Sequence, residues 1–159
     1  MARAKQPGGD VAARHAAHAD AEASRVFSSA PFVSELGIKL ESMMPGRCES
    51  SLILERRHLQ QDGFVHAGVQ ATIADHTAGA AAASVLKTGQ IVLTAEFKIN
   101  LLRAAHGEVL RCVAEVVKPG SRITFAESQV WCEQDGERRL VATASVTLAV
   151  VPAISLDES

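Results

Sequence analysis

The residues best suited to chemistry gather between positions 60 and 75 of the 159-residue chain. Within this stretch His66 precedes Ala67 and Gly68, where a helix pattern begins. The first turn of a helix leaves backbone N–H groups without partners, and the helix dipole favours negative charge at the same place. A developing oxyanion can therefore be stabilised at Ala67 and Gly68.

Asp75 stands about two turns further into this helix, between Ala74 and Ala78. The helix is apolar almost all round, which is typical of a buried helix, and a buried carboxylate is costly unless it has a partner or a task. An Asp that points outward or bonds to a neighbouring backbone group is the simpler alternative. The presence of Gln60 and His66 in the same stretch favours the catalytic interpretation, because oxyanion donors beside a carboxylate suit hydrolysis of an activated acyl group.

The elements that must position these groups can be predicted from the alternation of apolar and polar residues. The helix is expected to run through Leu86 and to stop at Gly89, a natural C-terminal cap. Two strand-like runs precede it and four follow, the last four in succession as an antiparallel meander. In the final run Leu140 and Ala142 are expected to share one face. The six runs cover residues 37–43, 47–56, 91–102, 108–118, 122–133 and 138–151.

These elements predict an α+β fold in which the sheet curls around one long helix. We expect a single domain over residues 24–151, beginning with a short amphipathic helix that Pro31 breaks or restarts. Residues 1–23 are expected to be a disordered or weakly helical extension, and residues 152–159 a frayed tail.

Composition excludes several classes of function. The net charge of -2 gives no electrostatic case for nucleic-acid binding, and no apolar run is long enough to span a membrane. The cysteines Cys48, Cys112 and Cys132 fit no metal spacing and are expected to be reduced core residues of a cytoplasmic protein. No secretory signal is expected, because the first 30 residues contain no continuous apolar segment.

The order of motifs resembles the PaaI-like hotdog-fold thioesterases, a family related to 4-hydroxybenzoyl-CoA thioesterase. The resemblance covers roughly residues 36–151 and depends on a set of features, none of which is specific alone. These are the turn His66-Ala67-Gly68-Val69, the helix acid Asp75, the run from Leu93 to Arg103, and Gly107-Glu108.

The resemblance implies a curved antiparallel sheet around a central helix. It also implies a homodimer joined edge to edge through its sheets, with dimers paired into a homotetramer. The sites would lie between subunits and cleave an acyl-CoA to free acid and CoA without a metal or other cofactor. An aryl or medium-chain acyl group is expected.

Individual site residues follow from the same resemblance. Asp75 matches the catalytic acid, and Ala67 and Gly68 match the turn whose amide polarises the thioester carbonyl. Gln60 stands where the family commonly has an asparagine that orients water or substrate, and Thr94 lies near a position that often carries a hydroxyl.

Two positions depart from the family pattern. Ala67 replaces the first of two glycines that often follow the histidine, which still leaves an N–H donor provided that the backbone needs no positive φ. Gln60 is one methylene longer than asparagine, and Gln61 is an alternative for its role. His66 is expected to cap the turn rather than to transfer protons.

The mechanism and the ligand contacts remain open at this level. Asp75 acts either as a general base for water or as a nucleophile that forms a mixed anhydride. Three basic residues at strand ends are candidates to bind the CoA phosphates: Arg103, Lys118 and Arg122. An enoyl-CoA hydratase or dehydratase on the same fold, or a non-catalytic acyl-CoA-binding protein, is the alternative to a thioesterase.

Overall fold

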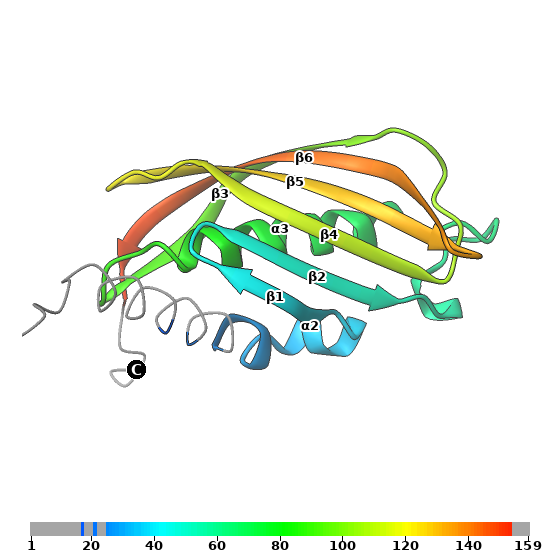
Figure 1. Ribbon diagram of the computed structural model, residues 1–159, viewed down its shortest axis with the longest axis horizontal. Helices are drawn as coiled ribbons and strands as arrows, with labels where there is room; N and C mark the ends of the chain where they lie inside the picture. The colour runs from blue at the N-terminus through cyan, green and yellow to red at the C-terminus, as the bar shows by residue number, and fades with distance from the viewer. Residues whose placement is uncertain (1–16, 18–20, 22–24, 154–159) are drawn as a thin grey trace, which may run out of the picture.

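A long helix and a curved antiparallel sheet form the body of the molecule in the computed structural model (Figure 1). The structure describes residues 17, 21 and 25–153. The strands are β1 (Lys39–Met44), β2 (Arg47–Ile53), β3 (Gln90–Leu101), β4 (Val109–Lys118), β5 (Ile123–Gln134) and β6 (Glu137–Pro152). The helices are α2 (Pro31–Leu36), α3 (Ala67–Ala83) and a single 3-10 turn, η1 (Arg56–His58). This arrangement confirms the α+β hotdog fold.

The helix α3 is buried along most of its length because alanines dominate it and let the sheet approach closely. Side-chain hydroxyls of the sheet add specific contacts to this packing. Ser128 of β5 donates a hydrogen bond to the carbonyl of Ala74 at 2.8 Å, and Ser50 of β2 bonds the hydroxyl of Thr77 at 2.6 Å. Buried polar groups are tolerated when they are paired in this way, so these bonds fix the rotation of α3 and the direction in which its polar residues point.

The strand order is β1-β2-β4-β5-β6-β3, so β3 lies at a sheet edge beside β6. The predicted meander of four successive strands is therefore wrong for β3, while β4, β5 and β6 do follow one another. The apolar periodicity of a strand predicts which side chains share a face, but it does not predict which strands lie beside it. This placement leaves one long side of β3 without a strand partner among the described residues.

Two further predictions were wrong in detail. The pairing between β5 and β6 shifts beside Trp131, so Leu140 pairs with Trp131 and Val141 turns to the core instead. The helix α3 ends at Ala83 with Ser84 as its C-cap, not at Gly89, whose φ of 81° serves the turn into β3. A local irregularity changes which residues face inward without changing the sequence pattern.

The boundaries at the two ends are partly described. Residues 25–28 are helical, and α2 begins at Pro31, which fits the predicted restart at a proline. The predicted extension over residues 1–23 lies almost wholly outside the described residues, as do residues 154–159 of the predicted tail. The strand β6 continues to Pro152.

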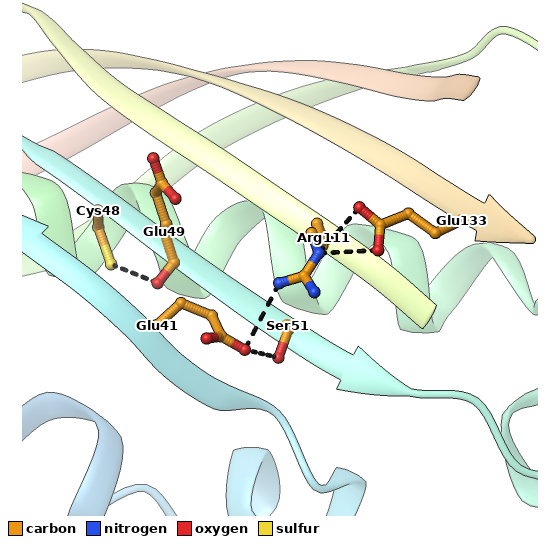
Figure 2. A network of polar contacts seen from close by, with 6 residues as sticks. All are labelled: Glu41, Cys48, Glu49, Ser51, Arg111 and Glu133. Carbon is orange, nitrogen blue, oxygen red and sulfur yellow. Dashed lines mark hydrogen bonds and ion pairs between the residues drawn. The ribbon is translucent and has the colours of Figure 1, made fainter. Parts of the chain in front are cut away.

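An ion-pair network crosses the sheet face turned away from α3 (Figure 2). Arg111 of β4 contacts both carboxylate oxygens of Glu133 at 2.9 Å and the carboxylate of Glu41 at 3.6 Å. Ser51 in turn donates a hydrogen bond to Glu41. Exposed pairs of this kind contribute only about 0–1 kcal/mol each, so the network chiefly favours the observed alignment of four strands.

Candidate active site

Asp75 lies on the side of α3 that faces the edge strand β3. Its carboxylate accepts a hydrogen bond from the hydroxyl of Thr94 at 2.8 Å, so the structure brings these two predicted site residues together. Burial raises the pKa of the half-buried Asp75 above its ordinary value, and the bond from Thr94 opposes that shift. Burial leaves the charged form of this carboxylate poorly solvated, which favours its reaction with a nearby proton or carbonyl.

A cavity of about 330 Å³ opens beside this carboxylate. Gly79 and Ala83 are small residues that follow Asp75 at helical spacing, and they leave room along one row of α3. The opposite walls come from the start of β3 and from the helical segment before α2. Its lining residues are Arg25, Val26, Ser29, Asp75, His76, Gly79, Ala83, Ile91, Val92, Leu93, Thr94 and Leu148.

The start of α3 forms a second candidate half-site. His66 is the N-cap, and its Nδ1 accepts a hydrogen bond from the amide of Gly68 at 2.9 Å. The amides of Val69 and Gln70 bond to the His66 carbonyl. Within the described part of the chain the Ala67 amide has no partner, which leaves it as the free donor of this turn.

Ala67 takes the place of a glycine without backbone strain. Among the non-glycine residues that the structure describes, only Asp135 has a positive φ. The amide that the sequence predicted as an oxyanion donor is therefore available from Ala67 rather than from Gly68. The adjoining cavity of about 320 Å³ is lined by Phe32, Leu36, Arg57, Leu59, His66, Gly68, Val69 and Thr72.

The two glutamines lie apart from both cavities. The side-chain oxygen of Gln60 accepts a hydrogen bond from the Asp62 amide, and Gln61 donates one to the Asp62 carboxylate at 3.1 Å. Within one chain they brace the loop before α3, and neither lines the cavity at Asp75. Their predicted contact with water or substrate stays a prediction.

Asp75 and the Ala67 amide are separated along a single straight helix. Eight residues at 1.5 Å each place them about 12 Å apart along the axis, and of the two only Asp75 lines the cavity of about 330 Å³. A water or thioester next to Asp75 is thus out of reach of the Ala67 amide of the same chain. The two halves can act on one substrate only if two chains supply them.

The basic residues predicted to bind phosphates are exposed and lie at opposite ends of the sheet. The carbonyl of Arg122 accepts a hydrogen bond from the amide of Val150, and Lys118 lies at the same turn. Val150 pairs with Val92, which lines the Asp75 cavity. Arg103 is in the loop whose Ala105 carbonyl bonds Val65, just before α3. Arg103 also lines a separate hollow of about 520 Å³.

His76 is a site neighbour that the sequence analysis did not single out. It lines the Asp75 cavity, and its ring meets the edge of Phe27 at a centroid distance of 4.6 Å. Burial lowers the pKa of His76 to about 4, so the ring is neutral beside Asp75 at neutral pH. The sequence signal that could have identified His76 is its position directly after Asp75, the acid of the helix.

The described residues contain neither a cluster suited to a metal ion nor a helix suited to cross a membrane. No group of three or more His, Cys, Asp or Glu among them could hold a metal ion. None of the helices in this part of the chain is long and apolar enough to span a membrane.

Comparisons with known proteins agree with this architecture. A family model described as "Thioesterase superfamily" matches residues 62–138. A 1,4-dihydroxy-2-naphthoyl-CoA hydrolase of Listeria monocytogenes is 26% identical over 117 residues, which cover 72% of this chain and 91% of that protein. The PaaI protein from the phenylacetic acid degradation operon of E. coli has a TM-score of 0.78 over 88% of this chain and 99% of its own, and at 19% identity it shows the fold alone.

A thioesterase family protein of Silicibacter pomeroyi provides the stronger match. It is 37% identical, with a TM-score of 0.83, and the match covers 85% of this chain and 99% of that one. Identity at this level over a whole domain, together with the family model and the hotdog fold, shows that the chain belongs to the thioesterase superfamily and is a thioester hydrolase.

Proposed function

We propose that the protein is an acyl-CoA thioesterase that hydrolyses an aryl or medium-chain acyl-CoA to free acid and CoA. The observation that carries this proposal is the Asp75 carboxylate, held by Thr94 at 2.8 Å and lining a cavity of about 330 Å³. The aryl class is supported by the relative named as a 1,4-dihydroxy-2-naphthoyl-CoA hydrolase.

The proposed reaction needs one base and one oxyanion donor. In the first form, Asp75 takes a proton from water as the water oxygen bonds to the thioester carbon. The carbonyl oxygen becomes an oxyanion that the Ala67 amide stabilises, the C–S bond then breaks, and CoA leaves as a thiolate that is protonated. In the second form, Asp75 itself attacks to give a mixed anhydride, which water hydrolyses. Both forms use the same two groups.

The proposed site combines Asp75 of one chain with Ala67 of a second copy. Support comes from β3, whose outer side pairs with no strand in the part of the chain that the structure describes. Phe97 and Leu101 pair with the core positions Val146 and Ala142, so they point inward, yet they remain 41% and 47% exposed. An apolar edge of this kind is suited to pairing with another strand.

Antiparallel pairing of two β3 strands places the Asp75 end of one chain against the α3 start of the other. In this dimer Arg103 of one chain and Lys118 with Arg122 of the other approach a common site, where they would meet the CoA phosphates. We further propose that two dimers form a homotetramer and that the protein acts in the cytoplasm on a substrate that carries its own CoA, with no added cofactor.

A thiol-release assay tests the proposed function. The purified protein is given phenylacetyl-CoA, benzoyl-CoA, 1,4-dihydroxy-2-naphthoyl-CoA and octanoyl-CoA, with crotonyl-CoA as a probe for hydration. We expect release of CoA from at least one member of the panel and its loss in Asp75→Asn, by roughly 10²–10⁴-fold for a missing base. Equal rates in parent and variant would refute the role of Asp75, and hydration without thiol release would indicate the hydratase alternative.

A further inference from the structure

His58 is a fully buried histidine, 0% exposed, in the turn η1 between β2 and α3. Both ring nitrogens have partners. Nδ1 accepts the Glu55 amide at 2.9 Å, and Nε2 lies 2.9 Å from the carbonyl of Leu36. Because a carbonyl can only accept, Nε2 carries the proton, and these two contacts fix a single neutral tautomer.

The backbone of the same residue holds the start of α3. The His58 carbonyl accepts the amide of His66 at 2.9 Å, and the ring of His66 accepts the amide of Gly68 at 2.9 Å. The Ala67 amide lies between these two bonded positions. A continuous path of hydrogen bonds thus joins the C-terminal end of α2, through His58, to the turn that presents the free amide.

Other contacts also hold the segment between these points, among them the bond from the Val65 amide to the Ala105 carbonyl at 2.9 Å. The bridge of Leu59 with Val65 closes the loop, and Gln60 bonds within it. The cavity at the α3 start is lined by Leu36 on one side of His58 and by Leu59 and His66 on the other. His58 therefore links, through its ring and its carbonyl, two segments that line this cavity.

We propose that His58 is a positioning residue that aims the Ala67 amide at the thioester carbonyl, an inference that rests on the proposed function. Loss of the ring leaves the partly buried Leu36 carbonyl and Glu55 amide without these partners, and relaxation of the loop to satisfy them moves His66. A displacement of about 1 Å at a catalytic group costs about 10²-fold in rate. His58 touches no substrate, so binding is expected to change little.

The first measurement is amide hydrogen exchange, which needs no substrate. Peptides spanning residues 60–72 are compared in the parent, His58→Leu, His58→Gln and Val130→Ala. Val130 is a buried β5 residue outside this path of hydrogen bonds, so Val130→Ala controls for a general loss of stability. With each protein held equally far below its own melting temperature, we expect faster exchange at His66 and Gly68 in His58→Leu only. Equal exchange in His58→Leu and Val130→Ala would overturn the proposal.

The second measurement separates kcat from KM on the panel substrate that the parent hydrolyses fastest. In His58→Leu we expect kcat to fall by about 10²-fold, with KM nearly unchanged. In His58→Gln most of that loss is expected to return, because the side-chain amide can still donate to the Leu36 carbonyl. A kcat in His58→Leu equal to that of Val130→Ala would also overturn the proposal. A parent that hydrolyses nothing refutes the proposed function, and hydrogen exchange then decides the role of His58 by itself.

Discussion

Thr94 and Asp75 form the contact on which the proposed chemistry depends. The hydroxyl of Thr94 donates to the carboxylate at 2.8 Å and stabilises its charged form, whereas burial destabilises it and raises its pKa. Both proposed mechanisms need the ionised carboxylate. The pH dependence of kcat therefore reports the balance between this burial and this one hydrogen bond.

Thr94→Val is expected to shift the acid limb of the kcat profile to higher pH. Valine has nearly the shape of threonine but cannot donate, so the pKa of Asp75 rises further and activity falls at a higher pH as the solution is acidified. Profiles of kcat against pH for parent and variant measure the shift. Thr143→Val, on the far face of the sheet, is the matched control, and an unmoved limb in Thr94→Val would contradict this assignment.

Asp75→Asn is expected to stabilise the fold near neutral pH while it abolishes activity. The pKa of Asp75 is raised on folding, so the parent loses stability as pH rises from the unfolded pKa through the folded pKa, and the penalty persists above that window. Asparagine never ionises and avoids the penalty. Urea unfolding should show a gain for the variant at about pH 7.5 that disappears below about pH 4. A variant that is less stable at neutral pH would show that the charge is well compensated.

At the scale of elements, the first turn of α3 is the part that offers a donor. Proline is well tolerated at the first helical position and lacks an N–H. His66 already has φ -60° and ψ 138°, a conformation suited to the residue before proline. Ala67→Pro thus removes the free amide and leaves the helix intact.

We expect Ala67→Pro to lower kcat by about 10²–10³-fold, the usual effect of losing one oxyanion donor. The melting temperature should stay near that of the parent. Ala67→Ser, which keeps the amide, is the control and should retain activity. A fully active Ala67→Pro protein would assign the oxyanion to another donor.

The sequence predicted the elements better than their arrangement. The apolar periodicity located α3 and all six strands, and the order of His66, Ala67, Gly68 and Asp75 indicated the chemistry. It did not place β3 beside β6, because alternation carries no information about strand neighbours. The burial of Val141 in place of Leu140 depends on a shift in pairing between β5 and β6, and no residue type in β6 predicts that shift.

The candidate site was predictable only in part for a related reason. Asp75 and Ala67 were identified by type and spacing, which already put them about two turns apart on one helix, but the cavity beside Asp75 emerges only from the folded chain. The position of His76 in the cavity and the path through His58 depend on contacts with Phe27 and Leu36, which are distant in sequence. The side chains of Gln60 and Gln61 bond within their own loop, a local choice that composition does not reveal.

At the scale of the whole molecule, activity is expected to require the β3 edge. Phe97→Lys puts a charge on an inward-facing, 41% exposed position of that edge and should give a monomer. Asp75 and Ala67 remain in place, yet kcat should fall with dimer content, because the proposed site takes these two residues from different chains. Sedimentation velocity with parallel assays measures both quantities, and Lys98→Ala on the outer face of β3 is the control. A fully active monomer would place the complete site in one chain.

Mixing two inactive variants should restore activity. A dimer of Asp75→Asn with Ala67→Pro has one site with both lesions and one site with neither. In symmetric dimers purified through a tag on each variant, every dimer is mixed, so about half of the sites are intact. Co-expression with two different affinity tags and assay of the doubly purified protein tests this. No recovery would show that Asp75 and Ala67 act within the same subunit.

The unpaired side of β3 also matters before any partner is met. Within the described structure β3 is an edge strand of twelve residues with open backbone groups along its outer side, and Lys98 is the basic residue within it. Such an edge recruits other strands indiscriminately. Substitutions that weaken self-association without adding charge should therefore increase aggregation and reduce the yield of recoverable protein. That yield should then depend strongly on protein concentration and expression level.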